Sequence, residues 1–312
     1  MTHLIEAMKI VSYEIDGSWR PAFEAGGRLL DLREIVGVNG AQTPQSVRSM
    51  LELGTVQLAA YAGAARRAFS DGARGAPTDD VHLGPPVPDP QKLICLGLNY
   101  RDHAVETKMP LPISPILFPK FPNSLIGPND QIELPKGSRE IDYEGELAVV
   151  IGTRCKDVTE QQALSYVCGY SAFNDVTARD LQFQTSQWLP GKAIDTFGPM
   201  GPGIVLAEEV GDPQSLNMTT RVNGVPMQQS KTSEMIFSVA YTISFISSFM
   251  TLVPGDIIAT GTPAGVGFIR KPPVFLKEGD VVEVEIERIG SLRNLVVATA
   301  PAAGRTVPES RR

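Results

Sequence analysis

The chain contains few cysteines and histidines. Its 312 residues include three cysteines, Cys95, Cys155 and Cys168, and no Cys-x-x-Cys motif. Three cysteines cannot all pair, and their spacing matches no zinc-binding pattern. The sequence therefore argues against a disulfide-stabilised secreted protein and against a structural zinc site. A reducing cytoplasm is the expected location.

The chain also lacks an excess of basic residues and a secretion signal. Lysine and arginine total 28 against 35 acidic residues, for a net charge of −7. A negatively charged protein has no electrostatic attraction for nucleic-acid phosphates or anionic lipid. The N-terminal sequence MTHLIEAMKI lacks the basic, apolar and small-residue regions of a signal peptide. We therefore expect no nucleic-acid partner and no export.

One segment is long and apolar enough to raise the question of a membrane span. Residues 235–253 carry no charge but include six serine and threonine hydroxyls. Such a run is more typical of a buried helix than of a membrane span. We therefore predict a helix inside the folded domain, capped by Thr232 or Ser233, and no membrane partner.

The chain does contain enough apolar sequence for a substantial core. Hydrophobic residues make up 42% and charged residues 20% of the composition, as expected for a folded protein larger than a minimal domain. Residues 71–91 are rich in proline, glycine and aspartate without periodicity, which indicates a linker. The predicted organisation is a small N-terminal α+β domain (1–70), this Pro/Gly linker (71–91), a catalytic domain (92–298) and a disordered tail (299–312).

Strand patterns outnumber helical patterns. Short apolar or alternating runs bounded by turn residues predict strands at 10–13, 29–32, 92–97, 140–151, 170–174, 204–207, 221–223, 256–260 and 281–289. Helices are predicted after Thr43 and after Thr159, where the sequence Thr-Glu-Gln-Gln resembles a capping box. The predicted fold class is therefore α+β, mainly β.

The sharpest chemical signal is a strand with an acid at every second position. Glu140, Asp142, Glu144 and Glu146 alternate with apolar residues, and a two-residue period places all four on one face. The same face continues into apolar residues, so we expect Glu144 and Glu146 nearest the core and the outer two nearest solvent. Carboxylates that approach a core repel each other and need a cation. The alternative is a solvated strand edge paired with lysines such as Lys136.

Asp175 is a candidate third member of this acidic set. It follows the predicted strand 170–174 and precedes a helix-like start at 177–180, a position that faces a cleft in many folds. Three oxygen donors without cysteine or histidine favour a hard divalent ion, Mg²⁺ or Mn²⁺, over zinc. The alternative for Asp175 is a plain helix N-cap.

A single histidine lies within the predicted catalytic domain. In a helix, the spacing of His103 and Glu106 places imidazole and carboxylate on one side. A carboxylate beside histidine raises its basicity and orients it, as a general base for water requires. The alternative is an inconsequential surface pair. The proline-rich residues 107–116 that follow are a candidate lid.

Two further positions are candidates for contacting a substrate. Lys192 stands between glycine and apolar neighbours, where an ammonium could stabilise a developing oxyanion, although a surface lysine is the commoner case. The glycine-rich segment 260–267 is neither a P-loop nor a dinucleotide-binding turn. We interpret it as a tight turn that offers backbone N–H groups and the Thr262 hydroxyl to a substrate. Serine and cysteine nucleophiles have no support, because no Gly-x-Ser-x-Gly elbow is present.

These residues lie in stretches that resemble the fumarylacetoacetate hydrolase family, over about residues 92–297. The matching stretches, in order, are LGLNYRDHAVE, DYEGELAVVIG, CGYSAFNDVTARDLQ, GKAIDTFGPMGP, RVNGVPMQ, MIFSVAYTISFIS and GDIIATGTPAGVG. A small preceding domain is common in bacterial members of this family. The resemblance implies a mixed β-roll fold for the catalytic domain and a homodimer.

The resemblance also implies roles for individual residues, and it gives Glu140 and Asp142 none. The implied metal ligands are Glu144, Glu146 and Asp175, the implied water-activating dyad is His103 and Glu106, the implied oxyanion-side lysine is Lys192, and the implied substrate-side residues are Arg179, Gln182 and Thr262.

The predicted function is metal-dependent hydrolysis of a carbon–carbon bond in a small 1,3-diketo acid, such as an acylpyruvate or fumarylpyruvate. One Mg²⁺ or Mn²⁺ per subunit would chelate the 2-oxo acid end. The alternative enzymes on the same site are a 2-oxo diacid decarboxylase and a hydroxydienedioate isomerase. A non-catalytic binding module is a further alternative, but it would be expected to have lost a ligand or the dyad, and neither is broken.

Overall fold

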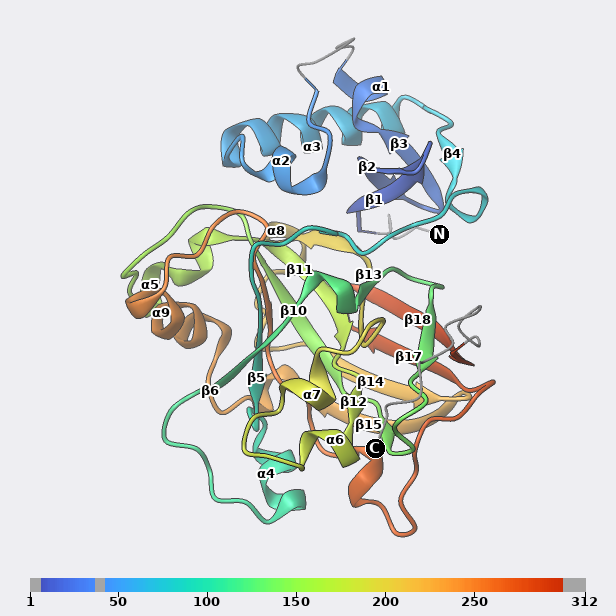
Figure 1. The fold of residues 1–312 in the computed structure, drawn as a ribbon. Coiled ribbons are helices and arrows are strands. Elements are labelled where there is room, and N and C mark those ends of the chain that lie inside the picture. The colour runs from blue at the N-terminus through green and yellow to red at the C-terminus, as the bar shows by residue number, and fades with distance from the viewer. Residues whose placement is uncertain (1–6, 37–42, 300–312) are drawn as a thin grey trace, which may run out of the picture.

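The computed structural model describes residues 7–36 and 43–299, and strands dominate this part of the chain (Figure 1). The predicted tail lies outside the described residues, apart from Thr299. The α+β, mainly β, class is confirmed, and the mixed sheets match the fold of the implied family. Within the described ranges, no helix is long and apolar enough to cross a membrane.

The larger sheet joins the N-terminal part of the chain to the predicted catalytic domain. Its strands follow the order β4-β3-β2-β1-β13-β11-β10-β16-β5-β6, with β7 beside β13. Their bounds are β1 Lys9–Ile15, β2 Ser18–Ala25, β3 Arg28–Asp31, β4 Ala76–Pro77, β5 Leu93–Gly97, β6 Ile116–Lys120, β7 Leu125–Ile126, β10 Gly145–Ile151, β11 Val167–Asn174, β13 Gly198–Leu206 and β16 Ile257–Ala259. Because β1 pairs antiparallel with β13, the N-terminal strands extend the central sheet. The division into domains remains a prediction.

Two smaller sheets complete the described β structure. One has the order β15-β14-β17-β18-β8, and the other consists of β9 and β12. The bounds are β8 Gln131–Leu134, β9 Ile141–Asp142, β12 Thr177–Ala178, β14 Asn217–Val222, β15 Val225–Lys231, β17 Val281–Ile286 and β18 Gly290–Ala298.

The described helices are mostly short. They are α1 Leu32–Val36, α2 Val47–Leu51, α3 Thr55–Ser70, α4 Arg101–Thr107, α5 Glu160–Ala163, α6 Arg179–Gln182, α7 Leu189–Lys192, α8 Ala207–Val210 and α9 Val239–Phe249. The helices α2 and α3 pack on the N-terminal strands, while α5 and α9 lie together at another side of the molecule (Figure 1). The capping box predicted at Thr159 is present at the start of α5.

Strand β10 lies at the centre of the fold and is buried on both faces. Leu147 and Val149 contribute to a core that includes residues of α9 and of the five-stranded sheet. Ala148 and Val150 contribute to the opposite core, which includes residues of α2 and α3. A strand covered on both faces reads as a continuous apolar run, which explains why the sequence from Leu147 to Ile151 contains no polar residue.

The predicted strand at 140–151 is interrupted. Strand β9 ends at Asp142, and β10 begins at Gly145. Between them, the Glu144 N–H donates to the Asn174 side chain, and the Gly145 N–H donates to the Gln228 side chain. Side chains thus occupy these backbone donors, and the strand is interrupted at Tyr143 and Glu144, which we call the bend. The bend sets the direction of the Glu144 carboxylate.

The apolar helix starts later than predicted. Its N-cap is Ser238, whose hydroxyl accepts from the Tyr241 N–H, so the prediction of Thr232 or Ser233 as the cap is wrong. The backbone N–H groups of Ile236 and Phe237 donate to Asn99 instead. A helix cannot begin while these donors are held by another segment. The shorter helix α9 buries one face, as expected for a helix of a folded domain.

Candidate active site and metal centre

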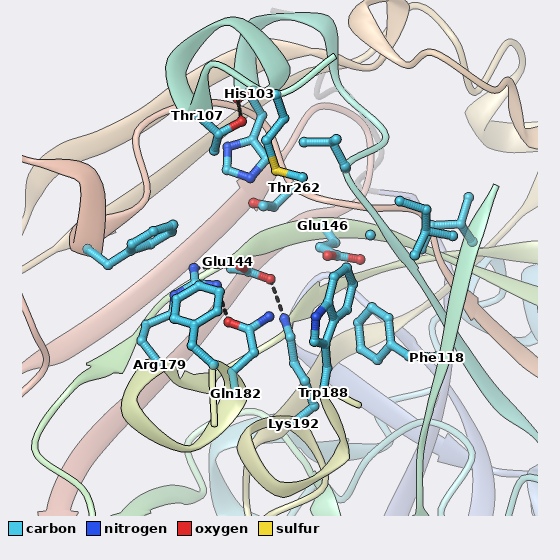
Figure 2. Close-up of a pocket in the computed structure, with 17 residues that line it drawn as sticks. His103, Thr107, Phe118, Glu144, Glu146, Arg179, Gln182, Trp188, Lys192 and Thr262 are labelled. Carbon is cyan, nitrogen blue, oxygen red and sulfur yellow. Dashed lines mark hydrogen bonds and ion pairs between the residues drawn. The ribbon is translucent and has the colours of Figure 1, made fainter. Parts of the chain in front are cut away.

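A small cavity collects most of the predicted site residues. Its volume is about 100 Å³, well below the roughly 300–1,000 Å³ of typical ligand pockets. Seven of the nine predicted residues line it, namely His103, Glu144, Glu146, Arg179, Gln182, Lys192 and Thr262. Figure 2 shows their side chains converging from α4, β10, α6, α7 and the loop after β16. Of the other two, Asp175 accepts a hydrogen bond from Lys192, and Glu106 is hydrogen-bonded to Nδ1 of His103.

The three predicted metal ligands come together because β10 and β11 pair antiparallel. Gly145 lies opposite Asn174 and Glu146 opposite Phe173, and the Asp175 N–H donates to the Glu144 backbone oxygen at 2.8 Å. Ligand oxygens of Glu144, Glu146 and Asp175 lie within 4.8 Å of one another, and all three residues are buried. The alternative of a solvated strand edge is therefore wrong for this stretch.

Two of these carboxylates are matched by cations. Lys192 Nζ lies 2.6 Å from both Glu144 Oε2 and Asp175 Oδ2. The Arg179 guanidinium lies 2.5 Å from Glu144 Oε1. Although burial works against ionisation, Arg179 and Lys192 hold the pKa of Glu144 at about 2. Glu144 is therefore an anion at neutral pH.

Glu146 has a different electrostatic environment. Its Oε2 accepts from the Gly261 N–H at 2.8 Å, and within residues 7–36 and 43–299 no ion pair reaches it. Burial, followed by the charges of Asp175 and Glu144, raises the pKa of Glu146 well above its usual value. A buried carboxylate beside two others is stabilised by a bound cation. The set offers oxygen donors alone, which suits Mg²⁺ or Mn²⁺, so the residues fit the implied metal.

The position of Asp142 differs from the sequence-based expectation. Glu140 is exposed as predicted, but Asp142 is fully buried. Its Oδ2 lies 2.9 Å from Arg179 Nε, and its Oδ1 accepts from the Gly267 N–H at 2.7 Å. Strand alternation placed all four acids on one face, so the error lies in the expected depth of Asp142, which Arg179 and the backbone of Gly267 cover. Asp142 orients Arg179, whose guanidinium also lies 4.3 Å from the centre of the Phe268 ring.

The predicted dyad is formed on α4. His103 Nδ1 lies 3.3 Å from Glu106 Oε2, and the imidazole points into the cavity (Figure 2). Both oxygens of Glu106 also accept from the Gly265 N–H at 3.0 Å. The carboxylate therefore joins the histidine to the loop after β16. This arrangement leaves Nε2 as the ring nitrogen available to a substrate.

The glycine-rich loop serves the protein rather than a substrate. Its N–H groups at Gly261, Ala264, Gly265 and Gly267 donate to side-chain carboxylates, so the expectation that they face a substrate is wrong. The Thr262 hydroxyl lines the cavity, donates to the Gly145 carbonyl and accepts from Gln228. The loop thus binds, through its backbone N–H groups, carboxylates that come from several different elements.

Lys120 is a site residue that the sequence analysis missed. Its side chain is fully buried, and Nζ lies 2.8 Å from Asp175 Oδ1. It also donates to the carbonyl oxygens of Val176, Lys192 and Phe197. Lys120 thus ties β6 to both the metal-ligand acid and α7. A lysine in the ordinary strand sequence Ile-Leu-Phe-Pro-Lys carries no signal of this role.

Comparisons with known proteins identify the family. Residues 92–297 match the family model described as the fumarylacetoacetate (FAA) hydrolase C-terminal domain. A mitochondrial oxaloacetate tautomerase of Xenopus laevis is 41% identical over 295 residues, which cover 93% of this chain and 91% of the relative.

Two solved structures extend the comparison. A fumarylacetoacetate hydrolase from Exiguobacterium antarcticum is 39% identical with a TM-score of 0.77, over 94% of this chain and 100% of that one. A maleylpyruvate hydrolase from Sphingobium, solved with manganese(II) and pyruvate, is 32% identical with a TM-score of 0.76, over 93% and 99%. The family model covers more than half of the chain, and the relatives include a tautomerase and hydrolases. This chain belongs to the fumarylacetoacetate hydrolase family of enzymes.

Proposed function

We propose that this enzyme interconverts the keto and enol forms of a small 2-oxo diacid, with oxaloacetate as the substrate of choice. The observation that carries the proposal is the small cavity, in which one base dyad faces three clustered carboxylates and two cations. Tautomerisation needs a base and stabilisation of negative charge, and it needs no space for a leaving group. The similarity to an oxaloacetate tautomerase supports the same choice.

The metal ligands of this site would be Glu144, Glu146 and Asp175. Mg²⁺ or Mn²⁺ held there supplies Lewis-acid stabilisation of negative charge on the oxygens of a 2-oxo acid. The chain itself supplies the remaining positive charge through Lys192, which lies beside Glu144 and Asp175.

The proton transfer belongs to His103. Its Nε2 takes a proton from C3 of the keto form, while Glu106 stabilises the imidazolium through Nδ1. The electron pair of the C–H bond forms the C2–C3 double bond, and the His103 imidazolium then returns its proton to the C2 oxygen, which gives the enol and regenerates the neutral base. No bond between heavy atoms breaks, and no water is consumed. The same residues run the reverse reaction.

In this proposal, Arg179 and Gln182 bind the second carboxylate. Arg179 Nη1 donates to Gln182 Oε1 at 3.0 Å, which turns the amide so that its NH₂ group remains for another acceptor. Both side chains lie on the side of Lys192 away from Trp188 and Phe118 (Figure 2). A diacid is therefore favoured over a 2-oxo monoacid.

Carbon–carbon bond hydrolysis of an acylpyruvate is the second candidate. The specific observation in its favour is the His103–Glu106 pair, since such a base also activates water. The similarity to a maleylpyruvate hydrolase points the same way. Hydrolysis requires the cavity to hold an attacking water and an acyl group as well. The homodimer and the cytoplasmic location also remain predictions.

The test follows the ultraviolet absorbance of enol-oxaloacetate with Mg²⁺ present. We expect the enzyme to accelerate its decay to the keto form, and removal of the metal by a chelator to abolish the acceleration. His103→Ala should lower the rate by about 10²-fold or more, the usual contribution of a positioned base. His82→Gln, which changes a histidine outside the cavity, is the matched control. Cleavage of an acylpyruvate without any effect on oxaloacetate would reject tautomerisation in favour of hydrolysis.

A further inference from the structure

We infer that Trp188 sets the upper limit on substrate size by closing the apolar side of the cavity. This inference deepens the proposed function and rests on it for the identity of the reaction. It assigns the discrimination between short and long 2-oxo acids to one side chain, which is not among the nine predicted site residues.

Trp188 is carried by the same short helix as Lys192. It is the N-cap residue of α7, and Lys192 follows four positions later as the last residue of the helix. Figure 2 shows the indole and the Phe118 ring together on one side of the Lys192 side chain, with Arg179 and Gln182 on the other. One helix therefore supplies a charged anchor and an apolar boundary, so their separation is fixed by helix geometry.

The indole is held in place by two contacts. A Cβ added to Gly97 would lie 2.3 Å from the Trp188 ring, so the ring rests directly on the backbone of β5. The Phe118 ring meets the indole edge to face, with 5.4 Å between centroids and an interplanar angle of 69°. An edge-to-face contact of this kind favours the observed ring orientation. The indole therefore forms one boundary of the cavity, and its contacts with Gly97 and Phe118 oppose its movement.

The chemistry of the cavity differs between its two sides. Arg179 and Gln182 on one side suit a carboxylate, whereas Trp188 and Phe118 on the other side present mainly ring carbon, with the indole N–H as the one polar group of the two side chains. A substrate group that extends toward the two rings makes mainly apolar contacts, and a long group must displace the indole. The structure thus admits short 2-oxo acids and excludes acylpyruvates with extended acyl chains.

The experiment measures kcat/KM for keto–enol interconversion with Mg²⁺ at saturation. It compares oxaloacetate with acylpyruvates whose acyl chain grows from acetyl to hexanoyl. We expect wild-type kcat/KM to fall steeply with chain length. Trp188→Ala should raise kcat/KM of the hexanoyl compound relative to oxaloacetate by at least about 10-fold, because each methylene accepted or rejected by an apolar pocket changes discrimination by roughly 10–200-fold. Trp188→Phe, which keeps a ring on Gly97, should give an intermediate ratio and guards against a folding defect of the alanine variant.

Trp19 offers a matched control. It is the other tryptophan of the chain, and it also lies on a glycine, since a Cβ on Gly84 would come within 2.5 Å of its ring. It lies on β2, away from the cavity. Trp19→Ala should leave the dependence on chain length unchanged.

A binding measurement separates this inference from the proposed function. Calorimetry with straight-chain 2-oxo acids from pyruvate to 2-oxohexanoate, in Mg²⁺, reports the size limit without turnover. If affinity falls with chain length in the wild type and this fall is smaller in Trp188→Ala, Trp188 sets the size limit even if oxaloacetate is not tautomerised. If Trp188→Ala and the wild type show the same dependence on length in both assays, the inference is overturned whatever the reaction.

Discussion

Glu146 is the carboxylate of the site that depends most on a cation. It is 1% exposed, and burial together with Asp175 and Glu144 raises its pKa. A neutral amide of the same shape removes a metal ligand and also removes the repulsion. The first change weakens metal binding, whereas the second favours the folded state without metal. Glu146→Gln is therefore an informative variant.

We predict that Glu146→Gln weakens Mn²⁺ binding by more than about 100-fold, since loss of an outer-shell partner alone costs 10–100-fold. The metal-free variant should unfold at the same temperature as the metal-free wild type or higher. Calorimetric titration with Mn²⁺ and thermal unfolding with a chelator check both parts. Retention of wild-type Mn²⁺ affinity would remove Glu146 from the ligand set.

Two acids that the sequence presents as equivalent provide a second test at the residue scale. Asp142 is buried against Arg179, whereas Glu140 is exposed. Breaking one side of a buried ion pair costs about 3–5 kcal/mol, while a surface change costs within about 0.5 kcal/mol. We predict that Asp142→Asn lowers the free energy of unfolding by about 3 kcal/mol and that Glu140→Gln leaves it unchanged. Urea unfolding of both variants measures the difference, and equal effects would contradict the assigned contacts.

Seven of the nine predicted site residues line one cavity, and they could be proposed from the sequence because they lie in distinctive stretches. Asp142 lies in one of these stretches and Lys120 lies outside them, and the contacts of both depend on burial. Asp142 is buried because Arg179 and the backbone N–H groups of Gly267 and Phe268 surround its carboxylate. Lys120 is buried because three carbonyl oxygens and Asp175 surround its ammonium. Contacts between distant segments decide both cases, and a local pattern carries no information about them.

At the scale of elements, the site depends on one pair of strands and one loop. The register of β10 and β11 places Glu144 beside Asp175. The loop after β16 then donates backbone N–H groups to Glu146, Glu106 and Asp142. Glu146, the His103–Glu106 pair and the Asp142–Arg179 pair therefore share one support, so a shift of this loop would move all three groups together.

The existence of these elements was easier to predict than their limits. Strand β11 and the helix α5 after the capping box at Thr159 agree with the predicted segments. The start of α9 and the break before β10 do not, because Asn99, Asn174 and Gln228 take backbone donors of those segments. Side chains from remote positions terminate elements at places that propensity does not mark.

At the scale of the molecule, the N-terminal strands are joined to the catalytic part by backbone pairing and by a charged cluster. Strand β1 pairs with β13. His82, from the segment between α3 and β5, lies 2.7 Å from Glu14 of β1 through Nδ1 and 2.7 Å from Asp130, beside β8, through Nε2. The imidazole thus bridges a carboxylate of the N-terminal sheet and one of the catalytic part.

This bridge predicts a dependence of stability on pH. Hydrogen bonds to Glu14 and then Asp130 raise the pKa of His82 above its usual 6.5. A raised pKa in the folded state means that protonation favours folding, so the contribution is complete below about pH 6.5 and is lost as the pH rises through the folded-state pKa. Because the imidazole is half exposed, solvent screening limits the effect to less than about 1 kcal/mol. We predict that the difference in unfolding free energy between the wild type and His82→Gln is largest near pH 6 and shrinks toward pH 8, and that added salt reduces it. Urea unfolding across this range measures the difference, and a difference that stays constant or grows with pH would show that the imidazole is not protonated between the two acids.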